Sequence, residues 1–273
     1  MGNILKFLVM STIGVISCIN FTSCSNEEDE PESEVRGTVT VNPATVFANG
    51  IPQKVGGMNL TVNSDGLVSA LTDGAVKVTF DYPCMSRSTE ADVIMRVSDE
   101  VGERVTSITL NDLGYSQYWK CVYDDGDVDE YWFEYNSGGQ LKKIKAQNCE
   151  GSGTVDFSYE NGNIVGVKMN PSDGGTMKIS YGSTPIKNVG GVMIFGMFGI
   201  GDDDFTEIQY SYYAGLLGKA TVSLPIKNEL YFDGESSIEN YTWTINDNGL
   251  PTKLTVEWID SEGSDTEDMF FVW

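Results

Sequence analysis

The sequence predicts an all-β fold: an antiparallel meander of successive β-hairpins that forms a curved, barrel-like or rolled sheet. Apolar residues recur with period two, as in Leu254, Val256 and Trp258, which alternate with polar residues and so indicate half-buried strands. Turns rich in Asn and Gly separate these stretches. The chain has 30 glycines but only 8 prolines, a balance that favours tight hairpin turns. A short apolar insert of one or two helical turns is expected near 189–201.

The chain begins with the parts of a secretory signal peptide over residues 1–23. Lys6 precedes an apolar stretch at 7–19, and two small residues lead to Cys24, as in exported proteins. The stretch is shorter than the roughly 20 apolar residues that a membrane-spanning helix needs. This arrangement is typical of a bacterial lipoprotein, whose cysteine becomes the acylated N-terminus. We therefore expect lipidation of Cys24, with palmitate among its acyl chains.

An acidic segment at 24–35 follows the signal peptide. Six of its residues are Asp or Glu, so it has little apolar surface to bury and is predicted to be a disordered tether. A lipidated cysteine followed by clustered acids resembles the export signal of surface-exposed lipoproteins of the Bacteroidetes. That resemblance implies an outer-membrane protein on the extracellular face, with the inner leaflet as the alternative.

Residues 36–273 are predicted to form a single all-β domain built from a repeated unit of strand, turn and strand. Asn and Gly in the turns supply the positive φ that tight hairpins need. Because twist accumulates from strand to strand, a sheet that grows by one hairpin at a time must curl. The copies of the unit lie at 60–67, 131–144, 155–167, 177–186, 208–217 and 241–254.

Several units place an aromatic residue directly before the turn, as in Tyr135-Asn136, Tyr159-Glu160 and Tyr181-Gly182. This pattern is similar to the tyrosine-aspartate repeats of Rhs-type shells. Over residues 57–273 the chain more closely resembles a family of Bacteroidetes outer-membrane lipoproteins of unknown function with a porin-like β fold. The resemblance implies that fold, and it brings no known active site.

Charge and composition exclude several classes of function. The chain carries 40 acidic residues against 17 basic ones, a net charge of −23, and no histidine. Such a surface does not bind nucleic acid through phosphates, and the usual histidine-based triads are ruled out. We predict a monomeric, non-enzymatic binding or structural module linked to outer-membrane uptake or glycan interaction. Its expected partners are the membrane, which it meets through the lipid, and a glycan or an outer-membrane protein. The alternative is a carboxylate-dependent glycoside hydrolase, which needs two acids about 5–10 Å apart.

Two apolar segments indicate what covers the two faces of the sheet. Residues 189–201 hold too many glycines for an exposed helix and too much apolar surface for a free loop, so we expect them to plug the open face of the sheet. An exposed patch that meets a partner or the membrane is the alternative. Residues 269–273 end on an aromatic residue, as many outer-membrane barrels do. An integral outer-membrane β-barrel is therefore a further alternative.

Aromatic residues gather in two strands, and three of them are candidates for ligand binding: Tyr118, Trp119 and Trp132. Neighbouring aromatic residues in a strand point to opposite faces, so one of each pair lies on the face that is not the core. Exposed rings of this kind stack on sugars, which suggests a glycan as the ligand. Cross-strand aromatic pairs that only stabilise the sheet are the competing interpretation.

Carboxylates crowd the segment between these strands: Asp124, Asp125, Asp127 and Asp129. Oxygen-rich loops are what calcium prefers, so calcium is the one cofactor that the sequence suggests. The spacing differs from that of an EF-hand, and a hairpin loop whose Asp-Gly supplies the turn explains the same residues.

Three cysteines follow the anchor, and they cannot all pair with one another. Cys121 and Cys149 lie on segments interpreted as neighbouring strands and are the preferred disulfide pair. Unpaired buried thiols are the alternative.

Overall fold

The computed structural model describes residues 39–83, 91–100, 102–149, 151–170, 175–198, 206–232, 234–261 and 263–273. Cys24, the signal peptide, the acidic tether and Cys84 lie outside these residues. The strands are β1 (Lys54–Val55), β2 (Met58–Val62), β3 (Val68–Asp73), β4 (Val76–Asp81), β5 (Val93–Ser98), β6 (Glu103–Leu110), β7 (Ser116–Tyr123), β8 (Val128–Tyr135), β9 (Leu141–Asn148), β10 (Gly151–Glu160), β11 (Asn163–Asn170), β12 (Thr176–Ser180), β13 (Ile186–Lys187), β14 (Ser223–Leu224), β15 (Lys227–Phe232), β16 (Glu235–Ile245), β17 (Pro251–Ile259) and β18 (Ser264–Val272). The helical elements are the 3-10 helices η1 (Pro43–Thr45) and η2 (Phe195–Phe198) and the α-helix α1 (Thr206–Tyr213).

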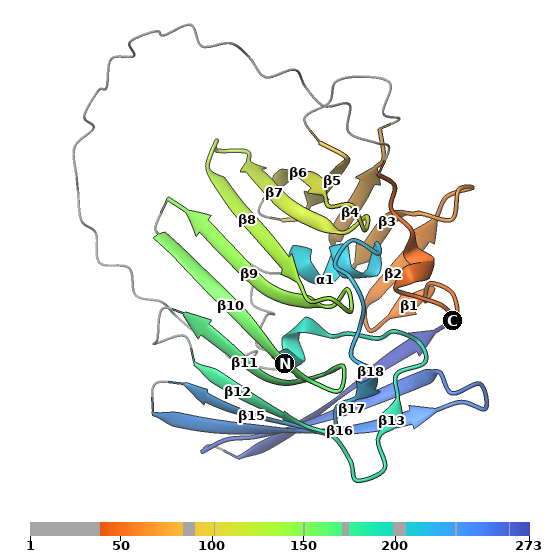
Figure 1. The fold of residues 1–273 in the computed structure, drawn as a ribbon, viewed down its shortest axis with the longest axis vertical. Helices are drawn as coiled ribbons and strands as arrows, with labels where there is room; N and C mark the ends of the chain where they lie inside the picture. Colours follow the sequence, from red (N-terminus) through yellow and green to blue (C-terminus); the bar gives the residue numbers. More distant parts are fainter. Residues whose placement is uncertain are drawn as a thin grey trace, which may run out of the picture. The chain divides into compact units, whose positions relative to one another are not determined.

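Sixteen of the described strands form a closed antiparallel barrel (Figure 1), and β13 and β14 form a separate two-stranded sheet. Each strand pairs with its neighbour along the chain, except that β12 pairs with β15 across the segment that carries β13, η2, α1 and β14. Lys54 of the two-residue strand β1 pairs with both Val272 of β18 and Asn59 of β2, which closes the ring. The predicted meander of hairpins is confirmed, except that the strands of the unit at 177–186, β12 and β13, do not pair with each other. The curl of the sheet is complete because no described barrel strand is left as an edge.

Four hairpins share one five-residue turn, Asn-x-x-Gly-x. In the turn between β8 and β9, the Asn136 side chain accepts hydrogen bonds from the backbone of Gly138 (2.9 Å) and Gln140 (3.1 Å). Gly139 has a φ of 82°, which glycine adopts without strain. The same bonds recur at Asn63, Asn111 and Asn246. All four turns lie at one end of the barrel, which we call the closed end and define by residues 63–67, 111–115, 136–140 and 246–250.

An aromatic residue at or near the end of each of six barrel strands has a structural role at this closed end. Its O–H or N–H group reaches back to a backbone carbonyl at or near the start of the preceding strand, and so joins the ends of neighbouring strands. Each such bond is worth about 0.5–1.5 kcal/mol net. The pairs are Tyr82 to Val68 (2.8 Å), Tyr135 to Ser116 (2.8 Å), Tyr159 to Leu141 (2.7 Å), Tyr181 to Ile164 (2.9 Å), Trp243 to Pro225 (2.7 Å) and Trp273 to Pro251 (2.7 Å).

The N-terminal segment covers the closed end. Val41, Val46 and Phe47 are buried there, and the backbone of Thr40 lies against the turn between β6 and β7. A Cβ on Gly114 of that turn would sit 2.6 Å from the carbonyl oxygen of Thr40, and its φ is 78°. Only glycine therefore allows this approach.

The interior of the barrel is a packed core, and α1 lies within it (Figure 1). The alternating residues that point inward include Val93, Met95 and Val97 of β5, each 0% exposed. The prediction of a strand–turn–strand unit at 208–217 is wrong, because residues 206–213 form α1 instead. Among the described residues, no helix has both the length and the apolar character needed to cross a bilayer.

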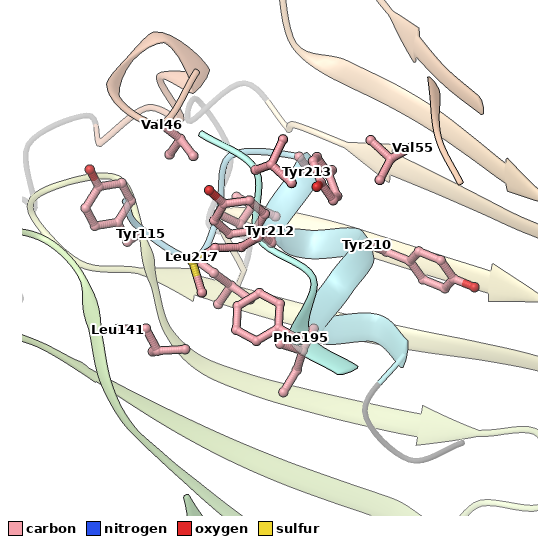
Figure 2. Packing of buried hydrophobic residues seen from close by; sticks show 14 of the residues in the cluster. Val46, Val55, Tyr115, Leu141, Phe195, Tyr210, Tyr212, Tyr213 and Leu217 are labelled. Atoms are coloured by element: carbon pink, nitrogen blue, oxygen red, sulfur yellow. The ribbon is translucent and has the colours of Figure 1, made fainter. Parts of the chain in front are cut away.

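The described part of the apolar insert is buried, as predicted. Val192, Met193, Phe195 and Met197 belong to the core, and η2 supplies the expected helical turn. Tyr212 of α1 lies next to Phe195 and Tyr213 in Figure 2, with ring centroids 5.6 and 5.3 Å away. The insert and α1 together fill the lumen.

The predicted disulfide between Cys121 and Cys149 is wrong, since both cysteines are free. Cys121 lies on β7 and points into the core, whereas Cys149 is exposed after β9. The intervening strand β8 separates the two by two strand spacings, about 10 Å. A disulfide requires Cα atoms within about 7 Å.

The outer face of the barrel is polar and carries ion pairs. Lys143 of β9 lies 3.2 Å from Asp156 of β10, and Lys253 of β17 lies 2.8 Å from Asp268 of β18. These residues alternate with the inward apolar ones, which is the pattern of strands with one wet face.

Candidate binding surface

Two of the three predicted ligand-binding aromatic residues lie side by side on the outer face. Tyr118 of β7 is the direct cross-strand partner of Trp132 of β8. The turn between these strands, Tyr123 to Asp127, is closed by the backbone bond from Tyr123 N to Asp127 O (3.0 Å). Residues 118 and 132 each lie five positions beyond the paired residues 123 and 127, so they face each other in the antiparallel pair. The register of the two strands is therefore set by the position of the turn at Gly126.

The two rings form one partly exposed platform. Their centroids are 5.5 Å apart with an interplanar angle of 46°. The Tyr118 hydroxyl donates a hydrogen bond to Glu130, and the Lys145 ammonium lies 4.5 Å from the Trp132 ring centroid. Desolvation, followed by the bond to Glu130, raises the pKa of Tyr118 to about 12. The tyrosine is therefore a neutral donor at physiological pH.

Polar side chains surround the ring pair in two cross-strand rows set by the strand register. They supply hydroxyl, amide and ammonium groups at the height of the rings. The first row is Thr109, Tyr118, Trp132, Lys145 and Thr154, and the second is Ser107, Lys120, Glu130, Gln147 and Ser152. Flat aromatic faces bordered by hydrogen-bonding groups suit a ligand with both apolar faces and many hydroxyls.

The third predicted residue, Trp119, lies on the opposite side of the sheet. It is 1% exposed, and its ring packs 4.6 Å from Phe133 and 6.0 Å from Tyr131. Trp119 therefore belongs to the core, in the cross-strand role that sequence reasoning kept as its competing interpretation.

The acidic hairpin uses its carboxylates in local hydrogen bonds. Asp124 accepts from the backbone of Glu103 (2.8 Å), Asp125 from that of Asp127 (3.1 Å), and Asp129 from the Tyr123 hydroxyl (2.9 Å). Within the part of the chain that the structure describes, no three Cys, Asp or Glu side chains gather into a group that could hold a metal ion. Calcium binding by this hairpin stays a prediction.

An ion-pair triad inside the barrel has no counterpart in the sequence analysis. Arg104 of β6 contacts Glu207 of α1 and lies 2.5 Å from Asp99. Burial lowers the pKa of Arg104, but its hydrogen bonds to Glu207 and Asp99 outweigh burial and raise that pKa overall. Positions 104 and 207 are far apart in the chain, so no spacing in the sequence points to this contact.

A further interior carboxylate, Glu239 of β16, accepts hydrogen bonds from the Tyr241 hydroxyl and from Trp258 Nε1 (3.1 Å). The structure also has an open hollow of about 420 Å³ on the rim beside β12, β15 and β16. Among its described lining residues, Glu235 is the one carboxylate, whereas glycoside hydrolysis ordinarily uses two.

Comparison with known proteins identifies the same architecture. A family model for a domain of unknown function (DUF4595) with porin-like fold matches residues 58–253. A porin-like protein from Bacteroides uniformis superposes with a TM-score of 0.59 and 17% identity, over 79% of this chain and 87% of that chain. A porin-like protein from Bacteroides vulgatus gives 0.53 and 8%, over 79% and 91%. No curated protein sequence matches the chain. At these identities the likeness to the solved structures concerns the fold alone.

Proposed function

This chain belongs to the DUF4595 family of domains with a porin-like fold, and from that premise we propose that it is a lipid-anchored outer-membrane protein whose barrel is a non-enzymatic, glycan-binding module. The observation that carries the proposal is the platform of Tyr118 and Trp132 on the polar outer face. The barrel stands in water, and the lipid on Cys24 holds it at the membrane.

The distribution of polarity supports a barrel outside the lipid. A membrane barrel presents an apolar band outward and polar groups to its lumen. Here the apolar residues point inward and fill the lumen, while Lys120, Glu134 and Lys145 are exposed on neighbouring strands. Lysines on a lipid-facing wall would each cost about 2–4 kcal/mol at the bilayer midplane.

The N-terminal sequence supports the proposed anchor. Cys24 stands between an apolar stretch and a run of acids, the arrangement of an acylated cysteine with a solvated spacer behind it. One acyl chain gives only marginal membrane binding, so several chains are expected on this residue. The acids behind Cys24 favour the extracellular face, where the platform would meet glycans before their uptake.

The platform has the chemistry of a glycan site. Sugar rings present C–H faces to Tyr118 and Trp132, and sugar hydroxyls bond to Lys120, Gln147 or Thr154. Glu130 offsets one of the two lysines near the rings, Lys120 and Lys145, and the whole chain is strongly acidic. This charge disfavours polyanionic glycans, so neutral glycans are the expected class.

Glycan-array binding of the wild-type chain and of Trp132→Ala tests the site. We expect wild-type binding to neutral glycans and a loss of at least about tenfold in Trp132→Ala, since burying an aromatic side chain against a ligand contributes about 1.5–3 kcal/mol. Tyr231→Ala is the control, because Tyr231 is an exposed aromatic residue on β15, outside the platform. A wild-type chain that binds no glycan, or equal losses in both variants, would contradict the proposal.

A further inference from the structure

A small cavity lies inside the barrel between α1 and the wall. It is lined by residues of β6, β7, β8 and α1: Thr106, Trp119, Cys121, Tyr123, Tyr131, Glu207 and Ile208. About 10 Å³ is open to the centre of a water-sized sphere, which is near the lower limit of about 10–15 Å³ for one water molecule. The size of the cavity therefore restricts any occupant to a single small molecule.

Two buried polar atoms on residues that line this cavity lack a hydrogen-bond partner among the described residues: the Thr106 hydroxyl and Trp119 Nε1. Each residue is 1% exposed. The Cys121 thiol, the cross-strand neighbour of Thr106, is within hydrogen-bonding reach of the Thr106 hydroxyl, and burial raises the pKa of the thiol, so it stays protonated. A protonated thiol is only a weak hydrogen-bond partner. A buried polar group without a good hydrogen-bond partner is destabilising, and two of them at one cavity point to a missing partner.

We propose that one ordered water molecule occupies this cavity and bonds to Thr106, Trp119 and Glu207. The indole N–H only donates and the ionised carboxylate only accepts, so the occupant must both accept and donate. A metal cation cannot accept a hydrogen bond from the indole N–H, and an anion is repelled by Glu207. Water satisfies all three side chains, since the threonine hydroxyl can take either role.

The water links helix α1 to the wall of the barrel. Glu207 belongs to α1, whereas Thr106 and Trp119 belong to β6 and β7. Glu207 also pairs with Arg104 of β6. The carboxylate thus holds the helix to the wall through an arginine and through a buried water.

Thr106→Val tests the site, because valine keeps the shape of threonine and removes its hydroxyl. If water is present, the variant deprives it of a partner, and we expect Tm to fall by about 2–4 °C, the shift for a loss of 1 kcal/mol in a domain of 150–250 residues. If the cavity is dry, the variant removes an unsatisfied group, and Tm rises.

Thr109→Val is the matched control, since Thr109 lies on the same strand and points outward beside Tyr118; its Tm should stay within 1 °C or so of the wild type. A crystal structure or a water–indole NOE on the wild-type chain gives the direct readout. A density peak within hydrogen-bond distance of Trp119 Nε1, together with a lower Tm in Thr106→Val, is the expected result. An empty cavity together with a higher Tm would overturn the proposal.

Discussion

Replacing Tyr212 by alanine is expected to lower the free energy of unfolding by about 3–5 kcal/mol, as for other buried aromatic residues. Tyr212 is 0% exposed and contacts the rings of Phe47, Phe195 and Tyr213 at centroid distances of 5.3–5.6 Å. Its hydroxyl donates to the carbonyl of Gly191 at 2.5 Å. The residue thus connects the helix, the insert and the N-terminal segment at the centre of the barrel.

Urea unfolding of the chain, followed by tryptophan fluorescence, measures this loss. Tyr212→Phe keeps the ring and removes the hydrogen bond, so it should cost about 1–3 kcal/mol. Tyr231→Ala is the control, because Tyr231 is 51% exposed on the outer face; its effect should stay within about 0.5 kcal/mol. Equal midpoints for Tyr212→Ala and Tyr231→Ala would show that the insert and α1 do not form the core.

Replacing Arg104 by methionine is expected to cost about 3–5 kcal/mol, because it removes the guanidinium that contacts two carboxylates in a largely buried site. The side chains of Arg104, Asp99 and Glu207 are 14%, 14% and 11% exposed. The loss should be recovered in large part when Asp99→Asn and Glu207→Gln are added, since neutral amides do not repel each other. That recovery would show that the destabilisation comes from the unbalanced charges and not from lost side-chain packing.

Arg96→Met is the matched control for this experiment. Arg96 lies 3.8 Å from Asp81 on the outer face, with side chains 46% and 67% exposed, and exposed pairs of this kind are worth about 0–1 kcal/mol. Urea midpoints of all the variants at one ionic strength give the comparison. If Arg104→Met were as mild as Arg96→Met, the triad would not hold α1 to the wall.

The meander and its turns are predictable because they depend on local chemistry. An Asn side chain that bonds to two following backbone N–H groups, with a glycine at positive φ, is specified within five residues. The pairing of Tyr118 with Trp132 likewise follows from a local turn, the one from Tyr123 to Asp127 that contains Gly126. The turn does not determine which of Tyr118 and Trp119 points outward, because both faces of the strand carry an aromatic residue.

The helix at 206–213 escaped prediction for a physical reason. Tyr210, Tyr212 and Tyr213 are all buried, because the barrel surrounds the helix, and a helix buried on most sides lacks the amphipathic period that identifies surface helices. Residues 208–212 also alternate like a strand. The Arg104–Glu207 contact was hidden for a related reason, since it joins elements that only the closed barrel brings together.

We propose a water-facing barrel with a filled lumen, held at the membrane by a lipid on Cys24. Detergent-free fractionation of bacteria that express either the full chain or residues 34–273, both grown with labelled palmitate, tests it directly. We predict that the full chain carries the label and sediments with membranes, whereas residues 34–273 are unlabelled and monomeric in the aqueous fraction. A shorter chain that still needs detergent, or a full chain without palmitate, would contradict the account.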